Sequence, residues 1–64
     1  SPKNAEAQNG INEIAMIYYK LAEKKMKLGR LKASMTRVER GLQVAPNNPE
    51  LNQLKREITE KWSQ

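Results

Sequence analysis

The sequence predicts an all-α chain, built as an antiparallel helical hairpin followed by a third helix. Three observations support this fold class. Apolar residues recur every three or four positions over most of the 64 residues. No segment alternates apolar and polar residues for long enough to predict a strand. Gly29 and the turn cluster from Pro46 to Pro49 divide the chain into three helical stretches of one small domain, residues 1–64.

The first helix is predicted over residues 5–28. At about 100° per residue, its apolar residues fall on one arc centred on Tyr18. They are Ile11, Ile14, Ala15, Tyr18, Leu21, Ala22 and Met26. Gly10 lowers helix propensity by about 1 kcal/mol relative to Ala, so the first turns are expected to fray. Gly29 is expected to cap the C-terminal end, because glycine adopts positive φ without steric cost.

The second helix is predicted over residues 30–45, where Pro46 ends it. Its predicted buried face contains Leu31, Ser34, Met35, Val38, Gly41, Leu42 and Ala45. Ser34 and Gly41 are small residues on the side expected to meet the first helix. We therefore expect the two helices to approach each other closely there.

The third helix is predicted over residues 49–62. Asn48 is a favourable N-cap, and Pro49 suits the first helical position because proline has no amide hydrogen to donate. Four apolar residues form one narrow stripe on an otherwise polar helix: Leu51, Leu54, Ile58 and Trp62. A narrow stripe is typical of a terminal helix that is covered on one side only.

The composition argues against most kinds of chemistry. The chain has no Cys and no His, which excludes disulfides, thiolate zinc sites and His-dependent nucleophilic catalysis. Its seven carboxylates all belong to Glu, and none is expected inside a pocket that would shift its pKa. We predict no enzyme activity, no catalytic residue, no metal and no cofactor. No apolar run approaches the roughly 20 residues of a membrane span.

The sequence leaves the cellular compartment open. It carries no targeting signal, and it begins with Ser1-Pro2 rather than Met. We interpret it as a piece of a longer protein. The cytoplasm is the default location, and the bacterial envelope is an alternative.

Residues 15–48 follow the pattern of a known helical repeat. Ala22, Ser34 and Gly41 occupy its small positions, Gly29 precedes its turn, and Pro46 closes it. Its larger apolar positions are filled by Tyr18, Leu21, Leu31, Val38, Leu42 and Val44. With the junction from Pro46 to Glu50, this stretch resembles the tetratricopeptide repeat, a family whose units repeat every 34 residues.

The resemblance implies a right-handed superhelical array of stacked hairpins. This chain would be one divergent repeat of such an array. Lys25 stands where the family usually has an aromatic residue. We expect its stem to pack and its ammonium to reach solvent; the alternative is an ion pair with a neighbouring acidic group. The third helix is out of register with a second repeat and resembles a capping helix. The first helix starts about ten residues early, which indicates an elongated repeat.

The resemblance also implies a protein-interaction or scaffold module. Ligands of the family lie against the concave side of the first helix, which here would present Met16, Tyr19, Glu23, Met26 and Lys27. The expected partner is a protein or peptide, a neighbouring repeat, or a second copy of the chain. Tyr19 and Glu23 stand where a clamp for C-terminal carboxylates would need Lys and Asn, so no such clamp is predicted.

The positive charge suggests an alternative function. The net charge is +5, and basic residues concentrate in the middle of the chain. The predicted patch contains Lys20, Lys24, Arg30, Arg37 and Arg40. A small basic helical domain of this kind can bind nucleic acid. The sequence favours an ordinary solvated face, because it has no interleaved aromatic residues and no glycine-rich phosphate loop.

Overall fold

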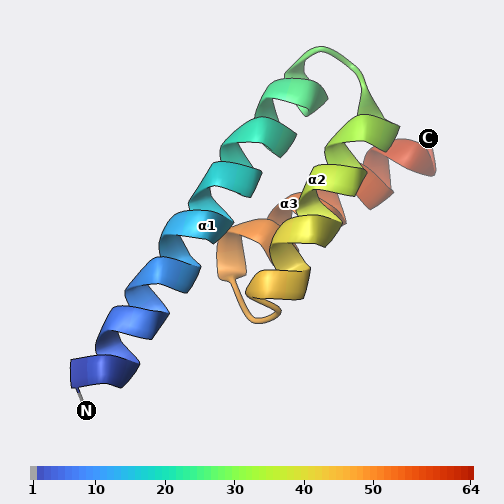
Figure 1. Cartoon of the computed structure of the whole chain (residues 1–64). Helices are drawn as coiled ribbons and strands as arrows, with labels where there is room; N and C mark the ends of the chain where they lie inside the picture. Colours follow the sequence, from blue (N-terminus) through green and yellow to red (C-terminus); the bar gives the residue numbers. More distant parts are fainter. Residues whose placement is uncertain (1) are drawn as a thin grey trace.

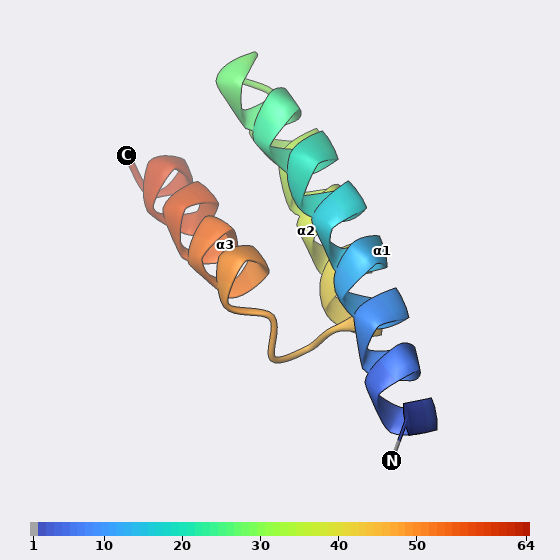
Figure 2. The same ribbon diagram turned by 90° about the vertical axis from the view of Figure 1, so that its left-hand side faces the viewer.

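A computed structural model describes residues 2–64 of the chain, with side chains from Asn4 onward. It contains three helices, α1 (Pro2–Lys27), α2 (Leu31–Val44) and α3 (Pro49–Trp62). α1 and α2 form an antiparallel hairpin, and α3 lies along one side of it (Figures 1 and 2). No strand occurs in this part of the chain. The predicted all-α hairpin with a third helix is therefore confirmed.

α1 is longer than α2, and its N-terminal turns project beyond the hairpin (Figure 1). The helix already begins at Pro2, earlier than the predicted residue 5. Gly10 is accommodated inside it, with no atom within 4 Å of the position that a Cβ would take. The glycine is thus tolerated within a continuous helix. Because the N-terminal turns of α1 project beyond the hairpin, the molecule is elongated and measures 46 × 17 × 13 Å.

Gly29 ends α1 in the way its sequence position predicts. Its φ of 76° lies in the left-handed region that favours glycine. The Gly29 amide donates to the Met26 carbonyl at 2.9 Å, and the Arg30 amide donates to the Lys25 carbonyl at 3.0 Å. These two bonds form a Schellman motif, which satisfies carbonyls at the end of the helix.

A Gly29→Ala substitution is expected to lower the free energy of unfolding by about 1–2 kcal/mol, because alanine is strained at positive φ. Gly29→Asn is the matched control, since asparagine tolerates this region better. Urea unfolding followed by circular dichroism measures both variants. Equal stability of the Ala variant and the unmodified chain would contradict the argument.

Small residues let α1 and α2 approach each other closely. Ala22 and Ser34 are fully buried, and the Ser34 hydroxyl donates to the Ala22 carbonyl across the hairpin at 2.7 Å. Two turns further along α2, a Cβ on Gly41 would lie 3.0 Å from the Cβ of Tyr18. The close approach predicted from Ser34 and Gly41 is confirmed.

α3 completes the core from one side of the hairpin. Asn48 caps it, because its Oδ1 accepts the Leu51 amide at 2.9 Å. The buried core residues form two clusters. The first contains Ala22, Met35, Val38, Leu54 and Ile58, and the second contains Ala15, Ala45 and Leu51.

The centre of the buried face of α1 differs from the prediction. The fully buried residues are Ala15 and Ala22, while Ile14 and Leu21 are 43% and 38% exposed. The predicted arc centred on Tyr18 is therefore wrong. Both neighbouring helices pack against the side that carries the small residues, because only there can their backbones come close. Ile14 and Leu21 then remain at its open edge, whereas Ile11, Tyr18 and Met26 are half-buried.

The end of the predicted stripe on α3 is also wrong. Trp62 follows Ile58 by one turn, but 52% of its surface is exposed. The core contacts of α3 come from Leu51, Leu54 and Ile58, and they end before Trp62.

Candidate functional site

The residues predicted to contact a partner lie on the side of α1 that turns toward α3, and they are not equally accessible. Tyr19 and Met26 are half-buried because they pack against the core clusters. Met16 is exposed. Glu23 and Lys27 form an ion pair at 3.8 Å. Since both side chains are substantially exposed, this pair contributes little to stability.

A shallow groove of about 370 Å³ follows the boundary between α1 and α3. Tyr19 lies on its α1 side. The residues that line it from α3 are Pro49, Glu50, Gln53, Leu54, Arg56 and Glu57. The only residue that the groove shares with the predicted contact set is Tyr19, so the structure does not gather the five predicted residues around one hollow.

The Tyr19 hydroxyl donates to the Glu23 carboxylate at 3.2 Å. Burial raises the pKa of Tyr19, and the nearby negative charge and hydrogen bond of Glu23 raise it further. The carboxylates of Glu57 and Glu50 act in the same direction from α3. The group is thus held in its neutral, donating form.

The raised pKa has a consequence for stability at alkaline pH. Below about pH 10 the tyrosine is protonated in both folded and unfolded chains, so it adds no pH dependence. At higher pH the unfolded chain loses this proton first, and the free energy of unfolding falls until the folded pKa is passed.

Ultraviolet titration at alkaline pH tests this directly. A Tyr18→Phe chain leaves Tyr19 as the only tyrosine, so its ionisation can be followed alone. We expect a pKa above the ordinary tyrosine value, and a lower one after Glu23→Gln is added. Glu60→Gln is the control, because Glu60 is not among the groups that raise the Tyr19 pKa. If Glu23→Gln and Glu60→Gln behave alike, the assigned cause is wrong.

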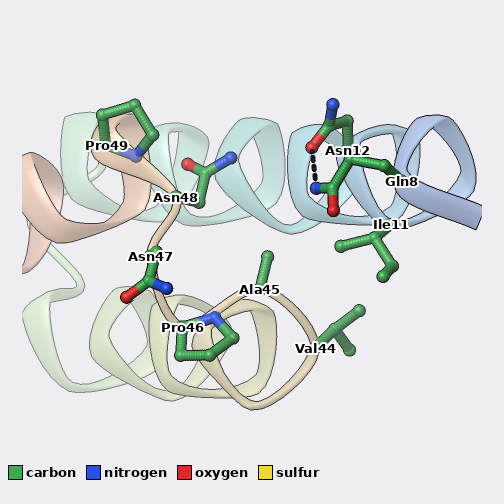
Figure 3. A pocket seen from close by; sticks show the side chains of 9 residues that line it. All are labelled: Gln8, Ile11, Asn12, Val44, Ala45, Pro46, Asn47, Asn48 and Pro49. Carbon is green, nitrogen blue, oxygen red and sulfur yellow. Dashed lines mark hydrogen bonds between the residues drawn. The ribbon is translucent and has the colours of Figure 1, made fainter. Parts of the chain in front are cut away.

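A second hollow of about 310 Å³ lies where α1 passes the loop between α2 and α3 (Figure 3). Ile11, Val44 and Ala45 lie between the two helices there, and the Gln8 Nε2 donates to the Asn12 Oδ1 at 3.1 Å. The other lining residues are Pro46, Asn47, Asn48 and Pro49. No ionisable side chain lines this hollow. Its amides can hydrogen-bond a polar group, but they offer no acid, base or nucleophile.

The largest accumulation of exposed apolar side chains lies elsewhere, on the side of α1 away from α3. Ile14, Ile17, Leu21 and Leu28 belong to it, and we call these four residues the hairpin face. Ile17 and Leu28 are 59% and 60% exposed. At about 100° per residue, the four lie within an arc of about 60°, which is next to the α2 contact. Val44 of α2 is also exposed, but it lies beside Ile11 in the hollow described above.

Sequence reasoning missed the hairpin face because it placed Ile14 and Leu21 in the core. It did not single out Ile17 or Leu28 as exposed. The signal was present in the spacing: Ile14, Ile17, Leu21, Lys24 and Leu28 follow one another at alternating steps of three and four. That spacing marks a second stripe, separate from the one built on Ala15 and Ala22.

The basic residues border this face. Lys20 and Lys24 are exposed on α1, on the side of the stripe that is remote from α2. On α2, Ser34 and Gly41 turn toward α1, so Arg37 and Arg40 lie beyond that contact on the side away from α3. Arg30 lies at the start of α2, at the same end as Leu28. The predicted basic patch is therefore split into two borders around an apolar stripe.

The described side chains were compared with two further kinds of site. Among residues 4–64 no group of three or more acidic, His or Cys side chains is placed to hold a metal ion. Within the same range, no helix combines the length and the apolar character that crossing a membrane requires.

Comparison with known proteins gives no assignment: the chain matches no protein-family model, no curated protein and no solved structure.

Proposed function

We propose that this chain is a protein-interaction module that works by presenting the preformed surface of a helical hairpin. The hairpin face carries the proposal, because four large apolar side chains remain 38–60% exposed on one side of a well-packed pair of helices. Contiguous exposed apolar surface of this kind is typical of interaction sites. A rigid helical surface also loses little conformational entropy when a partner binds.

The resemblance to tetratricopeptide repeats supports the same proposal. The three small positions of that pattern, Ala22, Ser34 and Gly41, are the buried residues at which the helices meet. In a stacked array each hairpin contacts a neighbour on both sides. Here α3 covers one side and the hairpin face lies on the other. We propose that the chain is a repeat of this type, with no catalysis and no cofactor of its own.

The alternative, binding of nucleic acid, is favoured by the two basic borders. It is opposed by what lies between them, because Ile14, Ile17 and Leu21 would be pressed against a polar, charged backbone. Protein grooves that bind single-stranded nucleic acid instead combine basic residues with aromatic ones, and the hairpin face contains no aromatic residue.

The proposal is tested by placing a photo-reactive amino acid at position 17 and irradiating cells that express the chain. We expect discrete protein adducts from position 17 and from position 21. Position 60 is the control, because Glu60 is exposed on α3, on the other side of the hairpin. No adduct above this control at either position would refute the proposed function.

Binding to duplex DNA tests the alternative function, a nucleic-acid interface. We expect no micromolar binding at low salt, and no effect of an Arg37→Ala, Arg40→Ala double substitution. Micromolar binding that falls steeply with added salt, and that this double substitution weakens, would instead support a nucleic-acid interface.

A further inference from the structure

The hairpin face is long enough to contact several turns of a helix. From Ile14 to Leu28, the residue that follows α1, it covers 14 residue steps, or about 21 Å at 1.5 Å per residue. Its steps of three, four and seven residues match the spacing with which one helix packs along another, and Lys24 occupies the intermediate position of the last step. α2 runs beside α1 and forms a second wall (Figures 1 and 2).

The charges along this face have nearly one sign. Lys20 and Lys24 follow one border, and Arg37 and Arg40 follow the other. Glu13 is the only carboxylate that the helical spacing places beside the stripe on α1. The ion pair between Lys27 and Glu23 lies on the other flank of α1 and involves none of these four cations. An occupant with negative edges would complement both borders.

We propose that the hairpin face binds one amphipathic helix of a partner protein, with apolar residues along its centre and acidic residues along both edges. This inference rests on the proposed function and specifies its partner. The central residues of the bound helix contact Ile14, Ile17 and Leu21. Its acidic edges face Lys20 and Lys24 on one side, and Arg37 and Arg40 on the other.

Two other occupants fit the hairpin face less well. A second copy of the chain would bring the same basic borders toward each other, and like charges oppose association. A membrane surface would accept the basic borders, but Trp and Tyr are the residues enriched at membrane interfaces, and the four residues of the face are all aliphatic. The exposed Trp62 belongs to α3, on the other side of the hairpin.

Two synthetic helical peptides test the proposal by fluorescence anisotropy against the full chain. Both carry Leu at alternating steps of three and four; one has Glu at the flanking positions, and the other has Lys at the same positions. We expect the Glu peptide to bind at least about tenfold more tightly at low salt, and the difference to shrink as salt screens the charges. Equal affinities for the two peptides, or no binding of either, would overturn the proposal.

A charge reversal locates the site. We expect the Arg37→Glu, Arg40→Glu double variant to reverse the preference, so that it favours the Lys peptide. Lys55→Glu, Lys61→Glu on exposed positions of α3 makes the same change in net charge and is expected to keep the preference for Glu. If both double variants shift the preference equally, the effect is one of net charge and the assigned site is wrong.

The apolar stripe is tested by Ile17→Gln with Leu21→Gln. We expect these substitutions to weaken binding of the Glu peptide by at least about tenfold, because buried aliphatic area is lost from the complex. Both residues are exposed in the free chain, so its circular dichroism spectrum is expected to be unchanged. Unchanged peptide affinity would overturn the proposal.

Two further measurements test the other occupants, a membrane surface and a second copy of the chain. Pelleting with phosphatidylserine vesicles, or dimerisation in sedimentation equilibrium, would overturn the proposal if the Ile17→Gln, Leu21→Gln variant abolished it. Photo-crosslinking distinguishes failure of the acidic-helix proposal from failure of the proposed function. Protein adducts at position 17 without a preference for the Glu peptide would reject the acidic helix alone, whereas absence of adducts would reject the proposed function as well.

Discussion

A Gly41→Leu chain is expected to lose about 3 kcal/mol of its free energy of unfolding, the upper end of the usual range for overpacked positions. Even the first carbon of the new side chain has no room: a Cβ at position 41 would lie 2.7 Å from the Leu51 Cδ1 and 3.0 Å from the Tyr18 Cβ. Leu51 can rotate, but Tyr18 Cβ is fixed to the backbone of α1. For a domain of this size such a loss removes a large share of the total stability.

Urea unfolding followed by circular dichroism measures the effect, and Gly10→Ala is its control. Position 10 is also a glycine inside a helix, but nothing lies within 4 Å of its missing Cβ. We therefore expect Gly10→Ala to stabilise the chain by about 0.5–1 kcal/mol through helix propensity alone. An unchanged midpoint for Gly41→Leu would show that the three helices do not meet closely at this point.

The Leu51→Ala chain is expected to lose about 2–5 kcal/mol, because Leu51 is fully buried and its truncation leaves a cavity. Leu51 joins α3 to Ala15 of α1 and Ala45 next to α2. Leu28→Ala removes the same atoms from a side chain that is 60% exposed, and we expect it to change stability by less than about 0.5 kcal/mol. Similar losses in the two variants would contradict the assigned core.

The two positions are expected to be coupled, since Leu51 is the nearest neighbour of the missing Cβ at Gly41. Truncating Leu51 makes room there, so Gly41→Ala combined with Leu51→Ala should destabilise less than the sum of the single substitutions. Additive losses would indicate that the clash with Tyr18 alone limits position 41.

The sequence predicted the helices and the closest contact well, for local reasons. Gly29, Pro46 and Pro49 restrict the backbone through their own covalent structure, and Asn48 caps α3 with its own side chain. Ser34 and Gly41 pointed to the closest part of the hairpin because few other pressures place small residues in mid-helix.

The hairpin face was less predictable, because periodicity identifies apolar positions without saying which neighbour covers them. α1 carries two overlapping stripes, one through Ala15 and Ala22 and the other through Ile14, Ile17 and Leu21. Residues of both stripes were combined in one predicted arc, in which the large Ile14 and Leu21 were expected to be buried beside Ala15 and Ala22. Packing favoured the first, since two helices can approach alanine more closely than isoleucine. Only the tertiary arrangement decides between them.

The overhang of α1 divides the molecule into parts that differ in cooperativity. Residues 4–9 are all exposed, whereas Ile11 already packs against a core cluster. The first turns are therefore held by backbone hydrogen bonds with little tertiary support, and they can open without disturbing the hairpin. Stability at this end is a local property of the helix, while from Ile11 onward it is shared with the whole fold. Changes in the overhang can therefore accumulate with little effect on global unfolding.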